Sequence, residues 1–256
     1  MPTSGLSADE VIAAFRAHSR NAVGFASVVC HPEPPTNTLG SRVGGEPYIE
    51  EGEEWPTDKA GRAMSFTLQL DFRGHENDLS FELPFQLLTL FCPENEFPFL
   101  TTDYVIRTYT NPGEHLSQAM DSSDWYEEDC WNEMTDPVAI DDIPDFEDLE
   151  FLSEQVGTAP MRIEDVHANY PTKIHEAFRE ELKKNPITKL GGFPHWLNGY
   201  NRPLCPICEQ LMFQLVQIDQ LAIEHHYLGA GGCGFAHLFF CPKHPSEFIT
   251  HVSPLS

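Results

Sequence analysis

Two stretches of this chain, 147 to 149 residues apart, carry the same three blocks in the same order. The first block reads Ser-Arg-Val-Gly-Gly-Glu-Pro in one stretch and Thr-Lys-Leu-Gly-Gly-Phe-Pro in the other. The block pairs are 41–47 with 188–194, 64–71 with 212–219, and 90–93 with 239–242. Chance could supply one such pair, but three in register predict a duplicated unit whose copies have diverged. A fold for this chain must therefore build the same turn and the same strands twice.

Each copy begins with a turn and continues into a strand. Gly-Gly followed one residue later by Pro favours a turn, because glycine tolerates positive φ and proline fixes φ just beyond it. In the first copy Phe66, Leu68 and Leu70 alternate with polar residues, which predicts a half-buried strand. The apolar runs at 87–92 and 104–109 predict further strands. We expect two β-rich repeats in a pseudo-two-fold arrangement around a shared core.

The segments outside the copies predict an α+β fold with a few flanking helices. A capping box predicts a helix over 8–19, which precedes a buried strand at 22–30. Apolar residues at helical spacing predict a second helix over 172–185. The predicted parts of one compact domain are an N-terminal helix and strand (1–40), the first repeat (41–107), an insert (108–161), and a helix with the second repeat (162–256).

Charge limits the classes of partner. The formal net charge is −25, with 15 Lys and Arg against 40 Asp and Glu, so the surface repels nucleic acid and anionic lipid. It can attract a basic protein, a cationic ligand or metal ions. No run approaches the roughly 18 apolar residues of a membrane span, and the N-terminal residues do not resemble a secretory signal. We expect a cytoplasmic protein.

The insert concentrates this charge. Between Thr108 and Pro160 there are 15 acidic residues and no Lys or Arg, yet the segment also carries several aromatic residues. Asp136-Pro137 and Ile143-Pro144 predict loops and short turns. Aromatic anchors surrounded by charge suit a protein interface. The candidate partner-binding residues are Asp121, Asp124, Trp125, Tyr126, Glu127, Glu128, Asp129 and Trp131.

Only the second copy carries a set of metal-type ligands. Cys205-x2-Cys208 and Cys241-x2-His244 each have Pro at the second position, as in a zinc knuckle. Three sulfurs and one nitrogen complete a tetrahedral Zn²⁺ shell without an open position, which indicates a structural site. Cys233 is a reserve ligand for His244. A redox dithiol or buried free cysteines are the alternatives.

The polar residues of the duplicated blocks have two interpretations. In the first, they belong to the fold, as duplicated turns and strands do. In the second, a cleft between the repeats binds a small ligand or a substrate, with Arg42, Lys189, Gln69 and Gln217 as polar contacts. The dense cluster at 224–226 lacks the His-Glu-x-x-His spacing of a hydrolytic zinc helix, and we find no enzyme signature in the sequence.

These blocks resemble the YwqG-like family of bacterial proteins, which has no assigned activity. The resemblance rests on 41–47, 64–71, 205–219 and 231–242, with Glu-Glu-Trp-Pro at 53–56. It implies a cytosolic α+β protein, and because some members lie beside polymorphic-toxin loci it implies an immunity role. We therefore expect a non-enzymatic protein that neutralises a basic toxin or effector by direct binding. An enzyme or small-ligand binder and an intracellular regulatory scaffold are the alternatives.

Overall fold

The computed structural model describes most of the duplicated regions. The described residues are 16–32, 39–94, 96–113, 130–144, 187–197, 202–223 and 234–253, with the single residues 13, 176, 180, 184 and 228. These residues are mainly strands, with one short 3-10 helix at Gln220–Ala222. Most of the two helices predicted at 8–19 and 172–185 lies outside them, so the α part of the predicted α+β fold stays a prediction.

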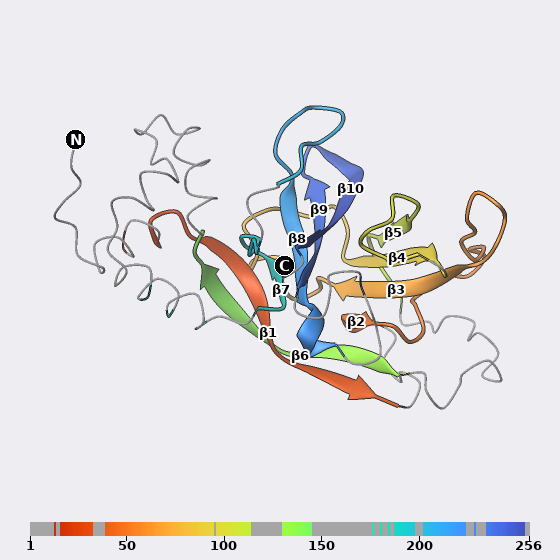
Figure 1. Ribbon diagram of the computed structural model, residues 1–256, viewed down its shortest axis with the longest axis horizontal. Helices are drawn as coiled ribbons and strands as arrows, with labels where there is room; N and C mark the ends of the chain where they lie inside the picture. Colours follow the sequence, from red (N-terminus) through yellow and green to blue (C-terminus); the bar gives the residue numbers. More distant parts are fainter. Residues whose placement is uncertain are drawn as a thin grey trace.

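Ten strands form one antiparallel sheet in the order β10-β9-β8-β7-β1-β6-β2-β3-β4-β5 (Figure 1). The strands are β1 (Arg20–His31), β2 (Arg42–Val43), β3 (Met64–Asp71), β4 (Leu87–Pro93), β5 (Val105–Tyr109), β6 (Trp131–Asp142), β7 (Lys189–Gly191), β8 (Phe213–Asp219), β9 (Phe235–Cys241) and β10 (His244–Ser253). The strands predicted at 22–30, 64–71, 87–92 and 104–109 are thereby confirmed as β1, β3, β4 and β5.

When every strand is replaced by the one five places away in sequence, the same strand order results, read from the other end of the sheet. β1 and β6 lie together at the centre, and each pairs with a short strand from the other half of the chain. β1 pairs with β7, and β6 pairs with β2. The two halves therefore hold each other through exchanged strands, and neither half-sheet is complete alone.

The sheet bends until its two ends meet. The hydroxyl of Tyr104, just before β5, donates to the carbonyl of Phe248 in β10 at 2.6 Å. Leu68 and Leu90 from one half and Val216 and Leu238 from the other belong to a single buried cluster. Burying one face of each half against the other gives a β domain with one shared core.

The duplicated blocks build the same local structure. Gln69 in β3 donates to the carbonyl of Gly40 at 3.0 Å and accepts from the amide of Tyr48 at 2.8 Å. Gln217 in β8 makes the equivalent bonds, to the carbonyl of Ile187 at 2.9 Å and from the amide of His195 at 2.7 Å. Each glutamine thus ties the ends of a Gly-Gly turn to the sheet.

Both Gly-Gly turns use positive φ. Gly44 and Gly45 have φ of 73° and 78°, and Gly191 and Gly192 have φ of 71° and 70°. Other residue types rarely adopt this conformation, so the glycine pair is required by the backbone in both copies. The register of β3 with β4 also shifts between Phe66 and Leu68, and that of β8 with β9 shifts between Gln214 and Val216. The copies therefore share a β-bulge as well as the turn.

The prediction of loops and turns around Asp136-Pro137 is wrong. Residues 131–142 form the central strand β6, which pairs with β1 along its length. Asp136 absorbs the irregularity with a φ of 52°. Pro137 lies opposite Phe25, whose amide donates to Thr188 on the β7 side, so the Pro137 nitrogen faces away from β1. A proline at such a position removes no ladder hydrogen bond.

This strand also changes how the middle of the chain is understood. Gly24 pairs with Lys189, and Glu133 pairs with the equivalent Arg42, so β6 occupies the place of β1 in the second half. The part of the acidic segment that lies in β6 therefore belongs to the duplicated unit. The additional chain of the second half lies between β6 and β7, a connection far longer than the one between β1 and β2.

Candidate metal centre

The first pair of candidate ligands lies on a tight loop. The loop is closed by the bridge between Leu204 and Leu211 and by the Met212 amide, which donates to the Pro203 carbonyl at 3.0 Å. Inside it, the Cys205 amide donates to the Gln210 carbonyl at 2.8 Å. These bonds curl the backbone so that the side chains of Cys205 and Cys208 converge.

The second pair comes from the turn between β9 and β10. Cys241 ends β9, His244 begins β10, and the two residues pair across the hairpin. Pro242 and Lys243 form the connecting turn and are exposed. The hairpin register therefore places the thiol and the imidazole side by side.

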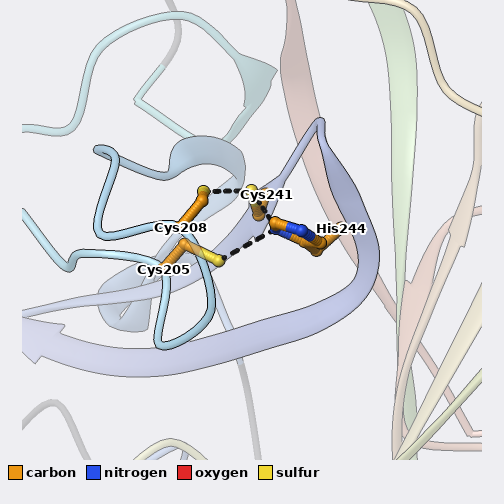
Figure 2. A group of neighbouring side chains, drawn as sticks. All are labelled: Cys205, Cys208, Cys241 and His244. Atoms are coloured by element: carbon orange, nitrogen blue, oxygen red, sulfur yellow. Dashed lines mark hydrogen bonds between the residues drawn. The ribbon is translucent and has the colours of Figure 1, made fainter.

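The four side chains meet at one point (Figure 2). Cys205 Sγ lies 3.5 Å from His244 Nδ1, Cys208 Sγ lies 3.7 Å from Cys241 Sγ, and Cys241 Sγ lies 3.7 Å from His244 Nδ1. All four candidate ligand atoms lie within 4.8 Å of one another. This set of three sulfurs and one nitrogen could hold a single metal ion.

Backbone amides favour thiolates in this cluster. Burial alone would raise the pKa of Cys205, but the amides of Cys208 and Ile207, with Cys241 and His244, lower it to about 6. The pKa of Cys241 is raised, first by burial and then by Cys205, against the amides of His244 and Lys243. Amides directed at sulfur stabilise the anionic form that a metal ligand requires.

Aromatic and apolar side chains pack against the candidate metal centre. Trp196, Met212 and Phe239 form a buried cluster with Cys205 and Cys241. Trp196 stacks on Phe239 with ring centroids 6.0 Å apart and an interplanar angle of 5°. The loop after the second Gly-Gly turn thus carries the ring that positions the knuckle.

The first half has no equivalent centre in its described residues. Cys92 occupies the position of Cys241, but its thiol donates to the Pro98 carbonyl at 3.5 Å, and burial raises its pKa to about 12. It is a core thiol. Across the residues that the structure describes, the Cys205, Cys208, Cys241 and His244 group is the one that meets the geometric requirement for a metal site. Cys233, the reserve ligand, lies outside the described residues.

The four residues predicted as groove contacts are fully buried. The side chains of Arg42, Gln69, Lys189 and Gln217 have 0% exposure. Arg42 donates to the Glu46 carbonyl at 2.6 Å, and burial lowers its pKa to about 10. Lys189 donates to Asp142 at 2.6 Å. In this structure the four side chains hold the turns and strands together, and the groove itself stays a prediction.

The predicted partner surface is only partly visible. Asp121, Asp124, Trp125, Tyr126, Glu127, Glu128 and Asp129 lie outside the described residues. Trp131 is described, and it differs from the exposed aromatic anchor that we expected, because it is 5% exposed. It stacks on His31 with ring centroids 4.5 Å apart, and the Arg42 guanidinium lies 5.9 Å from its ring. Its place at the start of β6 puts it in the interior.

A buried polar cluster in the second half escaped the sequence analysis. The carboxylate of Asp142 accepts bonds from Lys189 and from the Phe193 amide at 2.7 Å. His195 lies 3.4 Å from the Lys189 ammonium. Burial, and then this cation, lowers the pKa of His195 well below its usual value. Lys189 lies in a block that the sequence marks as a turn, and only the three-dimensional structure identifies Asp142 as its partner.

The chain was compared with known proteins. Residues 41–244 match the family described as Domain of unknown function (DUF1963), which covers both copies and ends at the fourth candidate ligand. The chain belongs to this family. A comparison with curated proteins found no match. Among the described residues, no helix is long and apolar enough to cross a membrane.

Proposed function

We propose that this member of the family is a non-enzymatic binding protein that uses an acidic surface to engage a basic protein partner. In its sharpest form it is an immunity-type protein that neutralises a basic toxin or effector in the cytoplasm. We also propose that the chain is a YwqG-like protein and that its two copies are related by a pseudo-two-fold axis. The equivalent hydrogen bonds of Gln69 and Gln217 support the second part.

The proposal rests on the observation that nearby carboxylates neutralise several cations, whereas many other carboxylates are exposed. Lys59, Arg62, Arg73 and Arg107 each form an ion pair with a nearby carboxylate. Arg42, Lys189 and Arg202 are buried, whereas Arg16, Lys184 and Lys243 are exposed. The exposed acidic residues of the described chain include Glu50, Glu51, Glu54, Glu76, Glu82, Glu94, Asp136, Asp141 and Glu209. The remaining field is strongly negative, and such a field steers and orients a basic partner.

The candidate metal is a structural Zn²⁺. With metal–sulfur bonds of about 2.3 Å and metal–nitrogen bonds of about 2.0–2.1 Å, a tetrahedron has sulfur–sulfur edges of about 3.8 Å and sulfur–nitrogen edges of about 3.5 Å. Three of the six edges, at 3.5 to 3.7 Å, agree with these lengths, and all four candidate ligand atoms lie within 4.8 Å of one another. Four protein ligands would saturate the ion, so it would hold the knuckle to the hairpin without binding a substrate. A reducing compartment such as the cytoplasm keeps the thiols available.

A pull-down from the native host tests the binding function. The zinc-loaded protein is used as bait at low and at moderate salt, beside a variant with Glu50, Glu51 and Glu54 changed to Gln. We expect a basic protein that binds the wild type more strongly at low salt and the variant more weakly at both, because surface attraction is screened by salt. Recovery of no basic protein at either salt would contradict the proposal.

A further inference from the structure

The two central strands, β1 and β6, differ in how their outer edges are protected against pairing with another strand. Beyond Phe25, the outer edge of β1 forms no ladder with another described strand over residues 26–31. The outer edge of β6 likewise forms no ladder with a described strand over 135–141, once β2 has ended. Among the described strands, two edges without a pairing partner therefore lie at equivalent places in the two halves.

The edge of β6 carries residues that block strand addition. Asp136 has positive φ, Pro137 lacks an amide hydrogen, and Asp141 adds an exposed charge. Proline and charge on an exposed edge are common protections against pairing with another chain. By the register of β1 and β6, the residue of β1 that is equivalent to Pro137 is Val28.

The edge of β1 lacks these protections. Residues 26–31 read Ala-Ser-Val-Val-Cys-His, without proline or a formally charged residue. The Val29 side chain is 41% exposed. Met134, which faces Val28 across the ladder, donates its amide to Ser41 on the β2 side. Val28 and Met134 are therefore a non-hydrogen-bonded pair, and the N–H and C=O of Val28 point to the open edge, as do those of Cys30.

We infer that the open edge of β1, residues 26–31, accepts an extended strand of the basic partner by β-strand addition. This inference rests on the proposed function and names the contact within it. Main-chain bonds to Val28 and Cys30 supply affinity in this mode, and the flanking side chains supply specificity. Val29 and Glu133, which pair across the ladder, present an apolar and an acidic group on the same face. Val28 and the buried Met134 pair on the opposite face. A strand that alternates apolar and basic residues can therefore place its basic side chains on the Glu133 face and its apolar side chains on the Met134 face.

Charge favours this occupant over a second copy of the chain. Edge-to-edge pairing of two copies would bring together two molecules that each carry a net charge of −25. A basic strand relieves the negative field instead.

The test uses a labelled peptide of alternating lysine and valine, and the same peptide N-methylated at alternate residues. The unmodified peptide binds the wild-type protein and slows hydrogen exchange of the Val28 and Cys30 amides. Val28→Pro, which places on β1 the residue that β6 carries naturally, weakens binding about tenfold, since it removes an outward donor and adds a ring. Ala139→Pro, the matched change on the blocked edge of β6, leaves binding unchanged.

Several outcomes overturn the inference. They are no binding of the unmodified peptide, equal binding of the N-methylated peptide, equal binding by Val28→Pro, and a wild-type protein that is already dimeric through this edge. Repeating the host pull-down with Val28→Pro separates the two proposals. A basic partner recovered equally by both proteins overturns the β1 contact and leaves the proposed function standing, whereas no partner with either protein contradicts the proposed function.

Discussion

The two Gly-Gly turns are the same in backbone and different in the cation that each one buries. Gln69 and Gln217 make equivalent bonds to the main chain in both halves. In the first half Arg42 donates to a carbonyl and to Gln69, whereas in the second half Lys189 donates to the carboxylate of Asp142. Bonds from a side chain to the backbone thus define the shared fold, while the buried cation has changed from a guanidinium to an ammonium.

The metal centre gives the largest expected difference between the halves. Cys241→Ala removes one ligand and should cost more than about 5 kcal/mol, because binding of a structural zinc contributes directly to folding. The matched change Cys92→Ala, at the equivalent place in β4, should cost only about 1 to 2 kcal/mol as a small loss of packing. Urea unfolding measures both, and metal analysis by mass spectrometry should find one zinc per wild-type chain and none in Cys241→Ala.

A chelator provides an independent form of the same test. Hydrogen exchange after zinc removal should become faster in β9 and β10 before it changes in β3 and β4, because the ion connects the knuckle to the β9–β10 hairpin. The proposal of a structural zinc would be contradicted if gently purified protein contained no metal. It would also be contradicted if the two alanine variants lost equal amounts of unfolding free energy.

The buried ion pair between Lys189 and Asp142 gives the next largest effect on stability. Asp142→Ala should cost about 3 to 5 kcal/mol, because it leaves the fully buried Lys189 without its anionic partner. Glu133→Gln, at a half-buried carboxylate of the same strand, should cost about 1 kcal/mol or less. The double variant Asp142→Leu with Lys189→Met should be more stable than Asp142→Ala. Chemical denaturation of all three variants measures these losses of unfolding free energy. Equal losses in Glu133→Gln and Asp142→Ala would contradict this account.

The second Gly-Gly turn gives a smaller effect through the same carboxylate. A Cβ atom at Gly192 would lie 2.3 Å from Asp142 Oδ2, and its φ is 70°. Gly192→Ala should therefore cost about 2 to 3 kcal/mol, from backbone strain and displacement of the carboxylate. Gly52→Ala, with a φ of 90° but nothing within 4 Å, should cost only about 1 kcal/mol of backbone strain. Equal midpoints in thermal unfolding would show that the contact with Asp142 does not matter.

The sequence predicted those features that depend on local pattern. The strands with alternating residues, the Gly-Gly turns and the two ligand pairs were recognisable because period, φ requirements and spacing are properties of neighbouring residues. β6 was not recognised, because Pro137 argues against a strand unless the direction of its nitrogen is known. The buried role of Trp131 and the pairing of Lys189 with Asp142 depend on the exchange of β1 and β6 between the halves, which leaves no local signal.

Equivalent positions in the two halves also differ in whether their side chains can titrate. The equivalent strand pairs place His237 and His251 at the positions held in the first half by Thr89 and Arg107. His195 occupies the position of Tyr48, because the amides of both donate to the equivalent glutamines. The pKa of His251 is lowered by burial. That of His237 is lowered well below its usual value, first by burial and then by His251, His195 and Lys189. Tyrosine, threonine and arginine side chains do not ordinarily change charge near neutral pH.

This difference predicts a pH dependence confined to the second half. The unfolded chain binds protons at these imidazoles near the ordinary pKa of 6.5, whereas the folded protein binds them only at lower pH. The stability that they contribute is therefore complete above that pKa and falls as the pH drops below it. His251→Gln should show a smaller loss of unfolding free energy than the wild type between pH about 7.5 and about 5.5. A loss identical to that of the wild type would show that His251 does not contribute, and Thr89→Ser at the position equivalent to His237 serves as a control that should leave the pH dependence unchanged.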